Sequence, residues 1–499
     1  MSSIGGIGAR SLLMVQSLVD MRTQLGDLQR QMATGKRSDT YAGLGLDRGL
    51  TVGLRSQLAA IGSYNDTIGN VGVRVDIADA ALTRIAELGR EMKAVSGQIN
   101  SSIQRTTAKE TAKNAVDEII GLLNTQVGDR YIFSGLASDT SAVDSMNNVL
   151  YGDGVRAGLQ QIISERNQAD RGATGLGRLD ITAPTVTSVQ VAEDAAPSIF
   201  GFKLANITSS LTGSTVSPPA GMPPAMSVDV GATNPNAGEQ VKFTFTLPDG
   251  SLETITLTAT TSATPGAGEF TIGATSDVTA ANMQTALTGA LTTLANTSLA
   301  AASAIKAADE YFNMDAANPP MRVDGPPFDS ATGLLAGTPA NTVFWYTGEA
   351  GAQSARSTAT ARVDQAISVS YGLRANEQGI RWQLQHIAVM AVMPLSEMDP
   401  DIQLKSTELS ERLGLALGVP PGTESVEMIQ AELVGAQTSM GAAKERHTET
   451  KAALEDLLQG VEGVSTEEVA AKILTLQTRL EASLRATSML YQTSIINYI

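Results

Sequence analysis

Hydrophobic residues near the N-terminus repeat with heptad spacing. Six of them follow alternating steps of four and three residues: Met14, Leu18, Met21, Leu25, Leu28 and Met32. These steps place every member on one narrow seam of an α-helix, which is typical of coiled coils rather than of the wider apolar face of a globular helix. The polar residues at 34–38, Thr-Gly-Lys-Arg-Ser, are expected to end this helix.

Two more helices are predicted before residue 130. The second spans about 47–102 and carries an apolar residue every seven positions at Ile61, Ile68, Val75 and Leu82. Thr107 and Glu110 have the spacing of a capping box, in which each side chain satisfies a free backbone N–H at a helix start. The third helix is therefore expected to open there and to run to about Gln126.

The C-terminal region repeats this organisation. A helix is predicted over about 425–459, and the glycine-bearing turn at 460–463 ends it. Ser465 and Glu468 form a second capping box. The helix that they open has a seam with steps of four, three and four residues: Val469, Ile473, Leu476 and Leu480.

Proline separates the middle of the chain from its two ends. Of the 18 prolines, 14 lie between residues 184 and 339, and none follows Pro421. Because proline breaks helix interiors, long helices are expected at the ends and not in the middle. The middle is also acidic, since residues 176–345 hold 14 acidic and 5 basic side chains, a net charge of −9.

The middle contains a predicted β-hairpin. Apolar and polar residues alternate over 241–247, as in a half-buried strand. Pro248, Asp249 and Gly250 supply a turn, and alternation resumes at Ile255 and Leu257. An Ala/Leu-rich stretch at 279–308 is expected to be helical, and so is 354–393.

These elements predict a mainly α fold with an α+β insertion. Both termini would form a long antiparallel helical or coiled-coil rod, and the middle would form a mixed α/β outer domain. The expected division is 1–140, an N-terminal helical domain; 141–222, an irregular connecting region; 223–315, an inserted α+β domain with the hairpin; 316–353, a connecting segment; and 354–499, a C-terminal helical domain.

The amino-acid composition and net charge exclude or disfavour several kinds of site and partner. The 499 residues include no cysteine and only two histidines, which excludes disulfides, thiolate chemistry and multi-histidine metal sites. The net charge of −16 argues against nucleic acid as a partner, because phosphate binding requires a basic face. No apolar run approaches the length that spans a bilayer, so membrane insertion is not expected. The N-terminus lacks the basic region and cleavage site of a signal peptide.

No catalytic constellation stands out. Gly35 and Lys36 lack the glycine that a phosphate loop requires at position 30, where the chain has Arg30. His386 has no carboxylate or nucleophile close in sequence, so we expect a packed or surface side chain. His447 lies among charged residues and is expected on a solvated helix face. We therefore predict that the protein is not an enzyme and has no catalytic, cofactor-binding or metal-binding residues.

The two seams allow two interpretations. Amphipathic helices usually bury their apolar stripe inside their own domain. The narrow heptad spacing at both chain ends instead favours packing of the ends with each other and with neighbouring copies. The ten seam residues are then the predicted assembly interface.

Several stretches resemble the bacterial flagellin family, and especially its hook–filament junction branch. The Thr34–Arg37 break is similar to the family's S/T-G-K-R turn. The segments 123–135 (ending Gly-Asp-Arg-Tyr-Ile-Phe-Ser-Gly), 346–349 (Tyr-Thr-Gly-Glu) and 371–377 (Tyr-Gly-Leu-Arg-Ala-Asn-Glu) look like motifs of that branch, and 484–499 looks like its closing segment. The likeness covers about 1–140 and 345–499. One departure is Asp39–Gly43, which replaces the family's usual Pro-Ala-Gly-containing segment.

The resemblance implies a structural subunit of the flagellum. It implies export as an unfolded chain through a type III channel, with an uncleaved signal, and helical assembly outside the cell. It also implies that the terminal helices order mainly on assembly. The partners would be the chain itself, other flagellar axial proteins (flagellin and hook-associated protein 1) and an export chaperone.

Three functions remain open from the sequence. The first is a subunit of the hook–filament junction. The second is a flagellin that builds the filament itself. The third, of another class, is a soluble coiled-coil adaptor or an enzyme with an unrecognised site.

Overall fold

The chain divides into two compact units, called here the terminal unit and the central unit. The computed structural model describes residues 4–99, 101–195, 198–315, 317–349 and 351–496, and side chains only between residues 12 and 489. The terminal unit consists of Met1–Val71, Arg362–Ser368 and Thr438–Ile499. The central unit consists of Gly72–Ala361 and Val369–Gln437. Each unit is compact through contacts among its own residues.

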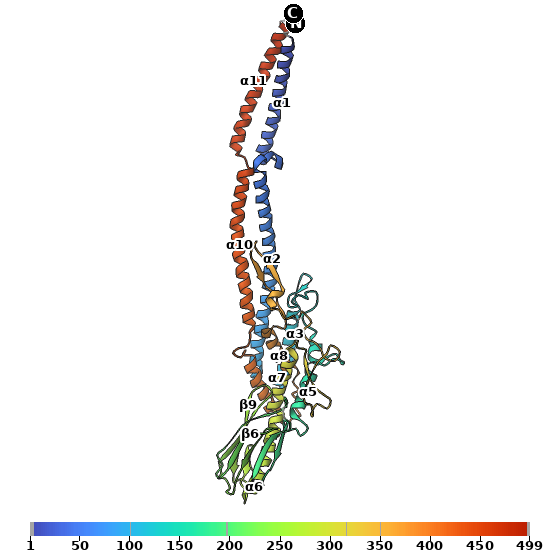
Figure 1. The fold of residues 1–499 in the computed structure, drawn as a ribbon, viewed down its shortest axis with the longest axis vertical. Coiled ribbons are helices and arrows are strands. Elements are labelled where there is room, and N and C mark those ends of the chain that lie inside the picture. Colours follow the sequence, from blue (N-terminus) through green and yellow to red (C-terminus); the bar gives the residue numbers. More distant parts are fainter. Residues whose placement is uncertain (1–3, 100, 196–197, 316, 350, 497–499) are drawn as a thin grey trace. The chain divides into compact units, whose positions relative to one another are not determined.

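In the terminal unit, two long helices from opposite ends of the sequence lie side by side. α1 (Ile4–Thr34) packs along α11 (Thr466–Ile496), as Figure 1 shows. α1 ends at Gly35, whose φ of +66° lies in the left-handed region that glycine tolerates best. The Val464 amide donates to the Gly35 carbonyl at 3.1 Å. The turn after α1 is thereby tied to the turn before α11.

A second helix pair continues the terminal unit. The 3-10 helix η1 (Tyr41–Asp47) leads into α2 (Arg48–Ser96), and α10 (Val426–Glu462) precedes α11. The first part of α2 packs against the last part of α10 through one apolar cluster: Leu54, Leu58, Ile61, Leu454 and Leu458. The terminal unit is therefore built from helices that are far apart in sequence and joined by narrow apolar contacts.

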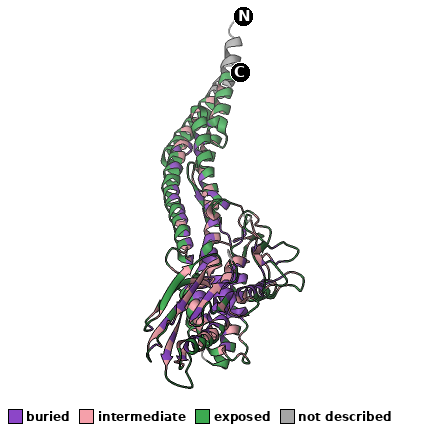
Figure 2. Ribbon diagram, turned by 60° about the horizontal axis from the view of Figure 1, so that its bottom comes forward, coloured by how far each residue is buried: buried purple, intermediate pink, exposed green. Residues whose placement is uncertain are grey.

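The central unit contains the remaining helices, which pack closely. These are α3 (Ser102–Leu123), α4 (Met146–Tyr151), α5 (Leu159–Arg171), α6 (Ser276–Asn296), α7 (Ser298–Phe312), α8 (Gln378–Val392) and α9 (Ile402–Ala416). α3 contacts α8, and α7 contacts α5, α8 and α9. α8 is buried along most of its length. Figure 2 shows buried residues collecting in this unit, whereas exposed residues cover most of α1 and α11.

Two helix starts differ from the sequence prediction. α3 begins at Ser102, not near Thr107, because Ser101 is its N-cap and accepts from the Gln104 amide at 3.3 Å. The helix expected over 354–393 is confined to α8. Its first part instead forms η2 (Ala355–Thr358) and the short strands β13 (Thr360–Arg362) and β14 (Ser368–Ser370).

Two four-stranded sheets form the α+β part of the central unit. One has the order β10-β9-β8-β5 and the other β3-β4-β7-β6. The strands are β3 (Leu179–Thr182), β4 (Ser188–Glu193), β5 (Lys203–Ser209), β6 (Thr215–Ala220), β7 (Ala225–Asp229), β8 (Gln240–Thr246), β9 (Leu252–Thr260) and β10 (Glu269–Thr271). Shorter pairs are β1 (Gln126–Val127) with β2 (Arg130–Tyr131), and β11 (Met321–Val323) with β12 (Leu334–Ala336).

The predicted hairpin is present as β8 and β9. Phe243 lies opposite Ile255 in an antiparallel register, and the apolar faces of both strands join a core covered by α6. That core also contains Leu179 and Val189, which lie in the region expected to be irregular. The sequence did not predict β-structure here because of its prolines. Pro218 and Pro219 lie in the edge strand β6, where a residue without an N–H does not interrupt the hydrogen bonds between inner strands.

The described elements confirm the predicted fold class, a mainly α fold with an α+β insertion. Among the residues that the structure describes, no helix combines the length and apolar character needed to cross a membrane.

Candidate functional site

Most predicted seam residues of α1 and α11 are less exposed than their neighbours, and the two helices contact each other. Five of those on α1 are half-buried: Met14, Leu18, Met21, Leu25 and Leu28. On α11, Val469 is buried, and Ile473, Leu476 and Leu480 are half-buried. The Thr487 hydroxyl lies 3.7 Å from the Met14 sulfur, which links the two helices beyond the apolar seam.

Met32 is the seam residue that the structure places elsewhere. Its side chain is 47% exposed, whereas Gln31 is half-buried and donates to the Arg37 carbonyl at 3.0 Å. The inward position after Leu28 therefore falls at Gln31, three residues on rather than four. The Gln31 side chain thereby links the last turn of α1 to the polar turn that follows.

A second apolar surface on the same two helices has no cover within the described chain. Its members are Leu12, Leu13, Val15 and Val19 on α1 and Leu474 and Leu484 on α11, and all are exposed. Exposed apolar side chains gathered on paired helices mark a surface that another protein can cover. The closing motif of the chain, which begins at Leu484, ends at residues 497–499, outside the described residues.

An ion pair joins α2 to the end of α10 within the terminal unit. Arg55 donates to both carboxylate oxygens of Glu462, from Nε at 2.9 Å and from Nη2 at 2.7 Å. This bidentate hydrogen bonding raises the pKa of Arg55 above its ordinary value, against the opposing effect of desolvation. The Glu462 carbonyl also accepts from the Arg37 amide at 2.6 Å. Glu462 thus holds α2 and the turn after α1 together.

His447 is buried, which corrects the expectation of a solvated position. Its ring stacks on Tyr64 with centroids 5.7 Å apart, and Nδ1 lies 3.0 Å from Asn65 Oδ1. Nε2 lies 3.8 Å from Asp364 Oδ1. The neighbouring charged residues suggested a wet surface, but α2 and the 362–368 segment, both remote in sequence, cover this face of α10.

His386 is a packed core residue. It is 1% exposed, and Nδ1 lies 2.7 Å from the Trp382 carbonyl one turn earlier in α8. Burial lowers the pKa of His386 to about 4, so the imidazole is neutral near pH 7. Its geometry matches the interpretation of a packed histidine rather than a catalytic base.

Three motifs that carry the family resemblance meet in the central unit. The Glu349 amide donates to the Ser134 carbonyl at 2.9 Å, and the Gly135 amide donates to the Leu373 carbonyl at 3.1 Å. The Ala375 amide donates to the Phe133 carbonyl at 2.9 Å. Segments more than 200 residues apart in sequence are thereby joined backbone to backbone.

Charged side chains complete this motif cluster. Arg374 and Glu349 lie 2.5 Å apart as an ion pair, and the Arg374 Nη1 group also donates to the Gly351 carbonyl at 2.7 Å. Arg356 pairs with Glu377, and Glu377 accepts from the Arg374 amide at 2.9 Å. Burial raises the pKa of Glu377 to about 7 in spite of the nearby Arg356. These ion pairs and hydrogen bonds hold the three motifs together.

Binding of a metal ion depends on how the described His, Asp and Glu side chains are grouped. Over the described ranges, no group of three or more His, Asp and Glu side chains is placed to hold one. The described residues provide a long helix pair with exposed apolar side chains and a central unit with a hydrogen-bonded motif cluster.

Residues 9–138 match the family of the bacterial flagellin N-terminal helical region. The chain therefore carries a flagellin-type N-terminal region. The matched residues include most of α1, all of α2 and α3, and the Gly128–Gly135 motif. No curated protein matches the chain. This match to the N-terminal part of the chain supports a flagellar structural subunit of the flagellin type.

Proposed function

We propose that the chain is a structural subunit of the hook–filament junction of the bacterial flagellum, the role of hook-associated protein 3. The observation that carries this proposal is a flagellin-type N-terminal region whose first helix pairs with the last described helix and leaves an apolar surface uncovered. Exposed apolar side chains on paired helices are expected where another protein packs against them.

The mechanism is helical self-assembly. In one copy, the seam of α1, including Leu25, packs on the seam of α11, including Leu476. The exposed set that includes Leu13 and Leu474 then packs against neighbouring copies. Burying an exposed leucine contributes about 1.5–3 kcal/mol, so a few such residues per copy are enough to drive association.

Partners and location follow from this role. The neighbours are further copies of the chain, flagellin on one side and hook-associated protein 1 on the other. An export chaperone would cover the terminal helices before export through a type III channel. The location is extracellular, at the junction.

The filament itself is a second candidate, since the matched family is that of flagellin. The junction is favoured by the motif cluster, because Arg374 and Glu349 belong to the segments that resemble the junction branch. It is also favoured by Asp39–Gly43, which departs from the segment usual in filament subunits.

Deletion of the gene tests the proposal. Electron microscopy should show bare hooks, and the culture medium should contain monomeric flagellin, because the filament has no base on which to grow. Shortened or missing filaments without shed flagellin would instead assign the chain to the filament. Normal flagella would contradict both roles.

A further inference from the structure

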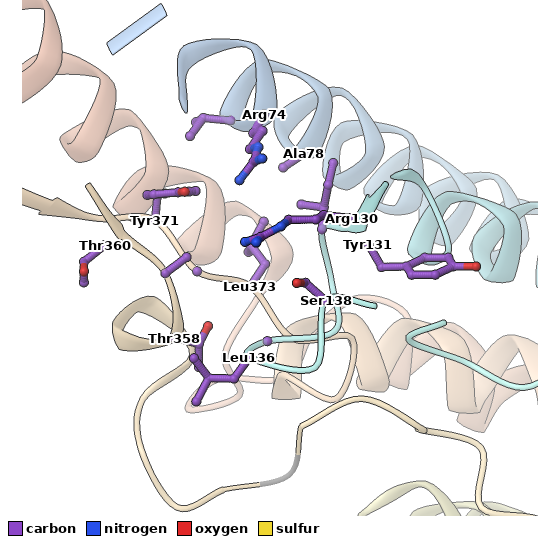
Figure 3. A pocket seen from close by; sticks show the side chains of 15 residues that line it. Arg74, Ala78, Arg130, Tyr131, Leu136, Ser138, Thr358, Thr360, Tyr371 and Leu373 are labelled. Atoms are coloured by element: carbon purple, nitrogen blue, oxygen red, sulfur yellow. The ribbon is translucent and has the colours of Figure 1, made fainter. Parts of the chain in front are cut away.

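A cavity in the central unit is lined by two arginines and by no acidic residue. Its volume is about 350 Å³. Arg74 comes from α2 and Arg130 from β2, and Figure 3 shows both side chains reaching into the same space while the Tyr131 ring points away. The hydroxyl-bearing side chains of Ser138 and Tyr371 line it as well. Hydrogen-bond donors from three segments therefore converge on one hollow.

Neither guanidinium has a partner among the described residues. No carboxylate there lies within 4.0 Å of Arg74 or Arg130, and neither side chain makes a hydrogen bond to a described group. Ten other arginines of the central unit form ion pairs, and Arg171 and Arg381, which do not line this cavity, form none with described residues: the ten are Arg84, Arg90, Arg105, Arg156, Arg166, Arg178, Arg322, Arg356, Arg374 and Arg412. The cavity thus gathers two cations that the fold leaves unneutralised.

The nearest carboxylates on α2 are engaged elsewhere. Asp76 accepts from the Gln437 side chain at 2.7 Å, and Asp79 accepts from the Gln430 side chain at 2.8 Å. Both bonds bind α2 to α10. They leave no acidic side chain of this helix to fill the cavity.

The cavity walls are held by close backbone packing. A Cβ on Gly372 would lie 2.1 Å from Thr358 Oγ1 and 2.4 Å from the Ala355 carbonyl oxygen, so only glycine fits between Tyr371 and Leu373. On the opposite side, the Tyr131 amide donates to the Ser138 carbonyl at 2.8 Å. The two arginines therefore extend from a preformed frame.

We propose that this cavity receives a carboxylate side chain from a second copy of the chain. Guanidinium groups bind carboxylates through paired hydrogen bonds, and a hydroxyl beside them can donate one more. Each copy offers many such groups, since 51 acidic residues outnumber 35 basic ones. The inference rests on the proposed self-assembly and adds a polar, orienting contact to the apolar contacts of the terminal helices.

Cross-linking of full-length protein tests the site. Arg74→Lys and Arg130→Lys keep the positive charge and supply an amine that a carbodiimide can join to a touching carboxylate. Polymer assembled from mixed light and heavy isotope-labelled copies distinguishes links between copies from links within one copy by mass. Arg90→Lys is the matched control, because Arg90 lies on the same helix, 3.5 Å from Glu427 of its own chain.

Links between copies at residue 74 or 130 should appear in the polymer and vanish in the dissociated chain, while residue 90 should give links within one copy. If the polymer forms and residues 74 and 130 give no links between copies, the carboxylate site is wrong and the assembly proposal stands. If the unmodified chain forms no polymer by electron microscopy, both proposals fail. Binding of inorganic phosphate that is lost in the Arg74→Gln, Arg130→Gln double variant, without links between copies, would assign the cavity to a free anion instead.

Discussion

At the scale of single residues, we predict that one seam position controls the pairing of the terminal helices. Leu25 is half-buried between α1 and α11, and Leu25→Asp would bring an unpaired carboxylate into that seam. Full burial of an unpaired charge costs about 3–5 kcal/mol, and the half-buried seam should retain enough of that cost to keep the variant out of polymer. Sedimentation of assembled protein checks this.

Gln24→Asp is the control for that prediction. Residue 24 is exposed on the same helix, so the same new charge meets water there. Normal incorporation of Leu25→Asp, or an equal defect in Gln24→Asp, would show that the seam does not govern assembly.

Glu377 makes the stability of the central unit depend on pH. Its carboxyl has a pKa of about 7 when buried beside Arg356, against 4.5 in the unfolded chain. The folded state therefore prefers the protonated form. The associated stability is full below pH 4.5 and is lost as pH rises through 7.

Urea unfolding at several pH values measures this effect. Between pH 4.5 and 7.5, the wild-type chain should lose about 3 kcal/mol more unfolding free energy than Glu377→Gln, which cannot ionise. Parallel pH profiles for the two proteins would contradict the raised pKa.

At the scale of elements, the start of α3 is a direct test of local capping. Ser101 accepts from the Gln104 amide, whereas Thr107 lies inside the helix. Ser101→Ala should lower the free energy of unfolding by about 1 kcal/mol, and Thr107→Ala should change it by much less. Equal losses, or a larger loss at Thr107, would place the functional cap where the capping-box pattern predicted it. Calorimetric or urea unfolding provides the comparison.

Elements were predicted correctly where they depend on residues that are close together in the sequence. Helices at both ends and the β8–β9 hairpin follow from spacing, because Leu25 and Phe243 each repeat with neighbours on the same face. The capping-box pattern at Thr107 predicted α3 too late, since Ser101 caps first. Prolines such as Pro218 argued against a strand in the sequence. A proline is tolerated in a strand at the edge of a sheet, and the sequence alone does not show which strand lies at the edge.

The candidate site was predictable in part for the same reason. Periodicity predicted the ten seam residues, whose role as an assembly interface stays a prediction, and it did not predict the exposure of Met32. The Arg374–Glu349 pair and the burial of His447 under Asn65 could not be predicted. The first joins two irregular segments, and the second joins helices far apart in sequence, so neither follows from local spacing.

At the scale of the whole molecule, the terminal helices are expected to gain order on assembly. α1 has mostly exposed side chains in a single copy, whereas α8 is almost entirely buried. Long helices with little buried apolar surface open easily. Amide hydrogen exchange of the dissociated chain should therefore be at least about tenfold faster in α1 than in α8.

Assembly should remove that difference. In polymer, exchange in α1 should slow toward the rate of α8, since neighbouring copies cover Leu13 and the residues around it. Slow exchange in α1 of the dissociated chain, or no change on assembly, would mean that the helix pair is already complete in one copy.

The proposed role places the protein at the junction between hook and filament. Immunogold labelling of intact flagella by electron microscopy tests it most directly, with cells lacking the gene as the control for the antibody. A junction protein should give label confined to a short band between hook and filament. Label along the filament would make the chain a filament subunit, and label only inside the cell would contradict a flagellar role.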